Sequence, residues 1–259
     1  MNKTVTSIAL AALGFGVGSA QAYSVYFGED LNNSATVPLA AVPFSAAAET
    51  AFKSNLTGIG TETFENQPTG ASTGLTLTFP GSAGDLTAKL EGSSGSVAAV
   101  TPGQTNGFGR YSVPSATSSK YWEVAAGSTT GDFTVTFGQD IAAFGFYGID
   151  IGDFGGQLQL QMLDAGNKII NTLTVNNTQL NDDGSVLYFG LIAGGSNELF
   201  RSIKFLTTSG SGDVFGFDNF TIADLGQVGP PIPEPATLTL VASGLLGIGI
   251  SLRRRRVLI

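Results

Sequence analysis

The chain has 259 residues, with 20 acidic and 12 basic side chains and neither cysteine nor histidine. Without these two residue types it has no disulfides, lacks the usual zinc ligand and the usual neutral-pH general base, and cannot form a Ser-His-Asp or Cys-His catalytic centre. The net charge of −8 argues against nucleic acid and other anionic surfaces as partners.

Residues 1–22 have the pattern of a secretory signal peptide. Lys3 supplies a basic start, residues 8–17 are apolar, and Ala20 and Ala22 form a small-x-small cleavage site. We therefore expect export and a mature chain that starts at Tyr23. Residues 23–229 then carry seven basic and nineteen acidic side chains, a net charge of about −12. This length suits one domain with a well-buried core.

A short helix is predicted near the start of this domain, over residues 45–56. Ser45 can cap an alanine-rich run that ends at Lys53, and Glu49 and Lys53 form a pair four residues apart. We expect the helix to precede the sandwich and to close one open end of it with Phe44 and Phe52.

The rest of the domain alternates apolar and polar residues with a period of two. Phe133 and Phe137 illustrate the pattern, and residues 157–163 and 168–175 form a hairpin around an Ala-Gly-Asn turn. Residues 141–149 are apolar on both faces, as in a central strand covered on both sides. About ten such strands predict an all-β fold, an antiparallel two-sheet jelly-roll sandwich.

Two short segments near the ends of the domain place a carboxylate next to aromatic residues. Residues 63–66 lie at the expected first core strand and residues 217–220 in the last one. The pair resembles the ends of carbohydrate-binding jelly rolls, in which a Phe-Glu and an Asp-Asn supply oxygens to a structural calcium. That resemblance implies Glu65 and Asp218 as calcium ligands, whereas the plain alternative is two edge-strand acids bonded to turn amides or to water.

A second acidic spot follows the expected central strand. Asp150 and Asp153 lie in a glycine-rich loop, residues 148–156, where they could chelate a cation or bond sugar hydroxyls, and Tyr147 or Phe154 could stack on a sugar ring. The alternative is that both acids bond the amides of their own turn.

The C-terminus combines a proline-rich stretch, a membrane segment and a basic cluster. Residues 230–235 contain the tripeptide Pro233, Glu234 and Pro235, and the 17 residues from 236 to 252 are uncharged. As a helix these 17 would span about 25 Å, enough to cross a hydrocarbon core. The basic cluster would keep the C-terminus in the cytoplasm. Its members are Arg253, Arg254, Arg255 and Arg256.

This tripartite tail, residues 233–256, resembles the PEP-CTERM sorting signal. The resemblance implies recognition at the tripeptide by an exosortase, a membrane-embedded transpeptidase, and removal of the tail during export in diderm bacteria that make exopolysaccharide. The chain would then be anchored transiently through residues 236–259 before it reaches the cell surface or the medium. A permanent tail anchor on a proline-rich stalk is the alternative, and a GPI signal fits the terminal arginines poorly.

Three functions remain open from the sequence. The first is an exported, non-catalytic surface or matrix protein associated with exopolysaccharide. The second is a lectin-like module for one defined glycan. The third is a glycosidase that uses two carboxylates, which requires neither histidine nor cysteine.

Overall fold

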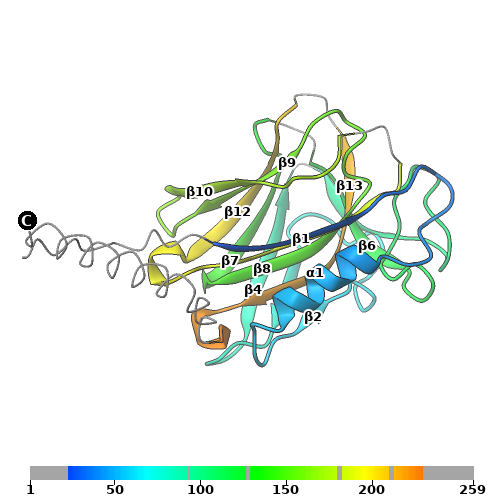
Figure 1. Cartoon of the computed structure of the whole chain (residues 1–259). Helices are drawn as coiled ribbons and strands as arrows, with labels where there is room; N and C mark the ends of the chain where they lie inside the picture. The colour runs from blue at the N-terminus through cyan, green and yellow to red at the C-terminus, as the bar shows by residue number, and fades with distance from the viewer. Residues whose placement is uncertain (1–22, 93, 127–128, 180–182, 210–212, 230–259) are drawn as a thin grey trace, which may run out of the picture.

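The computed structural model describes residues 23–92, 94–126, 129–179, 183–209 and 213–229. They form two antiparallel β-sheets packed face to face, with one helix on the outside (Figure 1). The predicted signal peptide and C-terminal membrane segment lie outside these residues. Within the described ranges, no helix has both the length and the apolar character that crossing a membrane requires.

Thirteen strands make up the two sheets in the described part of the chain, where we expected about ten. The seven-stranded sheet contains, in spatial order, β1 (Ser24–Asp30), β11 (Val186–Ile192), β8 (Ala143–Ile149), β13 (Val214–Ala223), β6 (Lys120–Ala125) and β5 (Gly95–Ala99), with β2 (Thr61–Glu62) also on β13. The six-stranded sheet contains, in spatial order, β10 (Ile169–Thr174), β9 (Leu158–Leu163), β12 (Phe200–Thr207), β7 (Phe133–Ile141), β4 (Leu86–Gly92) and β3 (Thr76–Phe79).

The inward faces of the two sheets enclose an aromatic core. Phe205 from one sheet lies with its ring centroid 5.2 Å from Phe217 and 5.6 Å from Phe146 of the other. Trp122 is also buried in this core, with its ring centroid 6.3 Å from that of Phe133. The all-β, two-sheet antiparallel prediction is therefore confirmed, as is the hairpin of β9 and β10.

The apolar stretch over residues 141–149 is divided between the sheets rather than forming one strand. Ile141 ends β7 in the six-stranded sheet, and β8 begins two residues later in the seven-stranded sheet. All seven residues of β8 are buried, because the core covers one face of the strand and α1 (Pro43–Lys53) lies over the other. Within residues 141–149, the expectation of a strand covered on both sides therefore holds for the part that forms β8.

The helix differs from the prediction in its start and its position along the chain. β1 comes before α1, so the helix does not precede the sandwich. It begins at Pro43, a residue favoured in the first turn of a helix, and Ser45 lies inside it. The Ser45 hydroxyl donates to the carbonyl of Val186 in β11 at 3.0 Å, so it joins the helix to the sheet instead of capping it.

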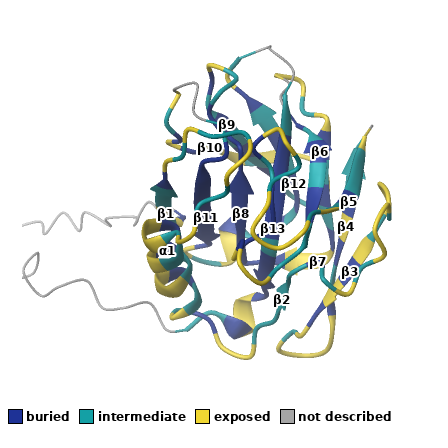
Figure 2. Ribbon diagram, turned by 90° about the vertical axis from the view of Figure 1, so that its right-hand side faces the viewer, coloured by how far each residue is buried: buried dark blue, intermediate teal, exposed yellow. Residues whose placement is uncertain are grey.

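The helix also packs against the outer face of the seven-stranded sheet, not across an open end of the sandwich (Figures 1 and 2). Phe52 is wholly buried there, over Gly145 and Gly190, which face each other in the sheet. A Cβ at either glycine would come within 3 Å of the Phe52 ring. Phe44 is 68% exposed, so its predicted role in closing the sandwich is wrong.

Both ends of the described domain lie at the same end of the sandwich. β1 begins with Ser24 opposite Ile192 and finishes with Asp30 opposite Val186, which itself faces Ile149. β13 ends at Ala223, next to Ala143. The opposite end, which we call the distal end, therefore carries the loops that follow β8 and precede β11 and β13. A strand of seven residues separates the two ends by about 23 Å.

Candidate functional site at the distal end

Four aspartates from three separate loops meet at the distal end. Asp150 and Asp153 follow β8, Asp183 precedes β11, and Asp213 precedes β13. Carboxylate oxygens of the first three lie within 4.8 Å of one another. The side chain of Asp213 contacts Asp153 closely enough to form a hydrogen bond when one of the two is protonated. We call these four residues the distal acidic cluster.

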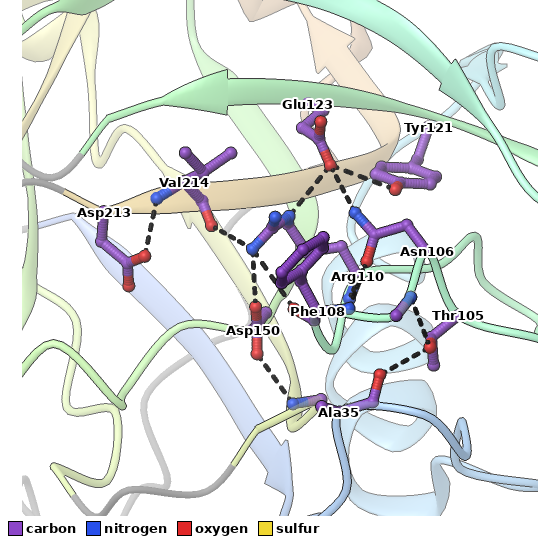
Figure 3. Close-up of polar contacts among 12 residues, drawn as sticks. Ala35, Thr105, Asn106, Phe108, Arg110, Tyr121, Glu123, Asp150, Asp213 and Val214 are labelled. Atoms are coloured by element: carbon purple, nitrogen blue, oxygen red, sulfur yellow. Dashed lines mark hydrogen bonds and ion pairs between the residues drawn. The ribbon is translucent and has the colours of Figure 1, made fainter.

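Arg110 links this cluster to β6 (Figure 3). Its Nη1 donates to Asp150 Oδ2 at 3.0 Å, and its Nε donates to Glu123 Oε2 at 2.9 Å. The same Nη1 reaches the carbonyl of Val214 at 3.2 Å, at the start of β13. The guanidinium also lies 5.7 Å from the ring centre of Phe108, which is 68% exposed. Arg110 is thus committed to several partners from different elements.

The backbone around Asp150 is shaped to bring it to this position. Asp150 itself has a φ of 64° directly after β8, which turns its side chain back toward the loop of Arg110. Gly109 has a φ of 81°, and a Cβ there would clash with Asp150 Oδ1. The same Oδ1 accepts a hydrogen bond from the Gly184 N–H at 2.8 Å. A residue other than glycine at position 109 would therefore displace Asp150.

Burial weakens the acidity of two members of the distal acidic cluster. Desolvation raises the pKa of Asp150 to about 6, although the Gly184 N–H and Arg110 both favour its charged form. Burial also raises the pKa of Asp213, and the neighbouring Asp153 carboxylate raises it further. Both carboxyl groups therefore ionise less readily than an exposed aspartate.

The structure brings the two acids predicted from the glycine-rich loop together and adds partners that sequence reasoning missed. Asp150 lies at the centre of the cluster, bonded to the Gly184 amide of a different loop as well as to Arg110. Asp213 directly precedes β13 and Asp183 lies three residues before the start of β11, and small residues adjoin both in the sequence. The sequence alone does not show that these residues meet Asp150, because that depends on which strands are neighbours in the sheet.

Asp218 and Glu65, the predicted calcium ligands, lie near enough for the charge of Glu65 to affect the ionisation of Asp218. Asp218 is fully buried in β13, and desolvation raises its pKa well above the ordinary range, with a further rise from the Glu65 charge. It accepts hydrogen bonds from Ser112 Oγ and the Val113 N–H, both at 2.8 Å, and from the Asn219 N–H at 2.7 Å. The Asn219 Oδ1 beside it is buried and has no hydrogen-bond partner in the part of the chain that the structure describes.

Glu65 lies in a turn after β2, not in a core strand as expected. Phe64 has a φ of 60°, which ends the short strand and turns the chain. Burial opposes ionisation of Glu65, but hydrogen bonds from Ser119 and Lys120 outweigh it and hold the pKa below its usual value. The Ser119 and Lys120 N–H groups lie 2.7 and 2.8 Å from Oε1. Calcium binding at Glu65 and Asp218 stays a prediction.

The C-terminal region is identified by comparison with known families. Residues 231–256 match the model of the PEP-CTERM protein-sorting motif. The chain carries a PEP-CTERM sorting motif. The match includes Pro233, Glu234, Pro235 and the four arginines from Arg253 to Arg256, and it starts two residues after the last described residue, Gly229. A PEP-CTERM motif implies export, a transient membrane anchor and processing by an exosortase.

Several solved structures show distant similarity to this chain. An adhesin domain of Lys-gingipain has 13% identity and a TM-score of 0.39, over 64% of this chain and 98% of that one. A DUF4465 family protein from Bacteroides caccae has 12% identity and a TM-score of 0.35, over 64% and 99%. A family 11 carbohydrate-binding module of Clostridium thermocellum has 10% identity and a TM-score of 0.27, over 65% and 96%. TM-scores this low support no conclusion about function. No curated protein matches the sequence.

Proposed function

We propose that this PEP-CTERM protein is a non-catalytic component of the cell surface or extracellular matrix that associates with exopolysaccharide. The observation that carries the proposal is the sorting motif at residues 231–256, which directly follows the β-sandwich. An exosortase-like transpeptidase would act at Pro233, Glu234 and Pro235, and the β-sandwich would then leave the membrane.

The placement of the chain ends supports a defined orientation before this processing. Tyr23 and Gly229 both lie at the end opposite the distal acidic cluster, since Gly229 bonds to Asn55 after the C-terminus of α1. A tail inserted in the membrane would hold the near end of the sandwich at the lipid surface. The distal loops would then face away from the membrane, where an extracellular polymer is accessible.

The outer face of the six-stranded sheet offers groups suited to a polysaccharide. Gln159 donates to the Thr174 hydroxyl at 3.1 Å across β9 and β10, and Gln161 faces Thr172 in the same way. Amide and hydroxyl groups of this kind form hydrogen bonds with sugar hydroxyls. Because these four side chains are uncharged, they do not repel an acidic polymer. This face supports broad association with a polymer rather than a single deep pocket.

A lectin-like site is the second candidate, and Phe108 favours it. Its ring is exposed at the distal end beside Arg110, where one face of an aromatic ring could stack on a sugar. Saturable binding of one oligosaccharide, lost in Phe108→Ala, would favour this candidate. Co-sedimentation with the host exopolysaccharide that Phe108→Ala leaves unchanged would favour the broad sheet face.

The sorting step is tested by replacing Pro233, Glu234 and Pro235 together with alanine. Mass spectrometry of the exported wild-type protein should give a C-terminus near Pro233, whereas the variant should stay in the membrane fraction with its tail. Asp85→Asn, an exposed change within the sandwich, is the control and should be released normally. A wild-type protein that keeps its tail outside the cell would overturn the proposal.

A further inference from the structure

The distal acidic cluster has the spacing of ligands around one metal ion. Calcium binds oxygen at about 2.3–2.6 Å, so two oxygens on the same ion lie at most about 5 Å apart. Oxygens of Asp150, Asp153 and Asp183 meet this condition, since all lie within 4.8 Å of one another. They come from two different loops, and no segment of regular structure holds them together directly.

Positive charge near the cluster is scarce. Among the described residues, Arg110 is the one cation paired with any member, and it is shared between Asp150 and Glu123. Asp153, Asp183 and Asp213 form no ion pair in the part of the chain that the structure describes. The hydroxyls of Tyr121 and Tyr111 are also nearby, and they donate to Glu123 Oε2 at 3.2 Å and to the Gly184 carbonyl at 2.8 Å respectively. The described groups thus leave three carboxylates without a balancing charge.

Two buried oxygens provide evidence that is independent of the spacing. The atoms Asp153 Oδ1 and Asp213 Oδ2 are buried and have no hydrogen-bond partner among the described residues, although the rest of each residue is partly exposed. Both atoms are acceptors, so the two carboxylates cannot bond to each other unless a proton or a cation lies between them. Burying an acceptor without a partner destabilises the fold, and more so when the acceptor is charged. A donated proton or a cation is therefore needed at this position.

We propose that the distal acidic cluster binds a divalent cation of the calcium class, with Asp150, Asp153 and Asp183 as ligands and Asp213 beside them. All the side-chain donors are carboxylate oxygens, which hard cations prefer, and the chain has no histidine or cysteine to favour zinc. Arg110 and the Gly184 amide hold Asp150 in place, so they are positioning groups. The ion would tie the loops before β11 and β13 to the loop after β8.

This site is separate from the one implied by Glu65 and Asp218. Asp218 lies within β13, beyond the Val214 end where the distal cluster is found, and bonds to Ser112 and Val113. The cation site also does not rest on the proposed association with exopolysaccharide. Loss of metal binding and loss of polymer binding are therefore distinguishable outcomes.

Calorimetric titration of the EDTA-treated, full-length protein with CaCl₂ tests the proposal. We expect saturable binding with a Kd of about 10⁻⁴ to 10⁻³ M, the range of extracellular calcium modules. The variant Asp153→Asn/Asp183→Asn should bind one ion fewer, or at least about tenfold more weakly. Hydrogen exchange gives the location, because calcium should slow exchange at the amides of Gly184 and Val214.

Controls separate a specific site from general acidity. Asp132→Asn removes an exposed acid elsewhere and should bind calcium as the wild type does. If the double variant fails to fold, Asp183→Asn alone serves, since that side chain has no hydrogen bond to lose in the described structure. Undiminished binding in either variant, or protection confined to the surroundings of Asp218, would overturn the proposal. So would a wild-type protein that binds no calcium below about 10 mM, well above the expected range.

Discussion

The Asp30 carboxylate accepts a hydrogen bond from the backbone N–H of Ser45 at 2.8 Å, and another from Phe44 at 3.2 Å. Asp30 is the last residue of β1, yet it caps the first turn of α1, whose own N-cap residue, Val42, has no side-chain hydrogen bond. A negative charge at this place also interacts favourably with the helix dipole. The buried Asp30 side chain thus fixes the start of α1 relative to the end of β1.

Replacing Asp30 with alanine should lower the free energy of unfolding by about 1–2 kcal/mol, the usual cost of losing a helix cap. Urea unfolding followed by circular dichroism measures this. Asp30→Asn is the matched variant, because asparagine caps as well as aspartate does, and it should recover most of the loss. Equal destabilisation by both changes would show that the capping hydrogen bonds are not what matters.

Phe52→Ala should destabilise the domain by about 3–5 kcal/mol, because it empties the space above Gly145 and Gly190 that the ring fills. Phe44→Ala, on the same helix but 68% exposed, should stay within about 0.5 kcal/mol of the wild type. Thermal melts of the two variants side by side check the difference. Similar losses in both would contradict the packing of α1 on the outer face of the sheet.

Asp224 should make stability depend on acid pH. Burial opposes its ionisation, but hydrogen bonds from Ser82 and Gly226 outweigh this and keep its pKa below the usual value. Because the folded-state pKa is lowered, the stabilisation is present above the unfolded pKa of about 3.9 and is lost as pH falls through the folded value. Unfolding measured from pH 6 to pH 2.5 should show this loss in the wild type and a weaker one in Asp224→Asn.

The control for this pH series is Asp85→Asn, an exposed change three residues after Ser82, which should keep the wild-type acid profile. At neutral pH, Asp224→Asn should also cost about 1–3 kcal/mol, since its carboxylate joins the Ser82 loop to the turn after β13. An acid profile unaffected by Asp224→Asn would refute the assignment.

Calcium at Glu65 and Asp218 makes a separate prediction. Calcium should raise the melting temperature and EDTA should lower it. The part of the increase that comes from this site should be lost in Asp218→Asn and retained in Asp153→Asn/Asp183→Asn. The reason is that a fully buried carboxylate without a cationic partner is costly until an ion neutralises it. Melting curves that neither calcium nor EDTA changes would contradict the prediction.

The local sequence was enough to predict the type of fold and several of its elements. Alternation over residues such as Phe133 and Phe137 follows from burial of one face of a strand, and the turn between β9 and β10 follows from its Ala-Gly-Asn residues. Both effects act over a few neighbouring residues, so they can be recognised in a single amino-acid sequence. The sorting motif was also readable, because tripeptide, apolar run and basic cluster are contiguous.

Tertiary structure decided what depends on residues far apart in the chain. Ser45 looked like a helix cap, but Asp30 takes that role because β1 ends beside the helix start. Phe52 looked like an end plug, but the paired glycines on β8 and β11 create a flat surface for it. The distal acidic cluster likewise exists because β8, β11 and β13 are neighbours in the sheet, which places the end of one strand beside the beginnings of the other two. Strand order is set by the packing of the whole core, so no local pattern could reveal it.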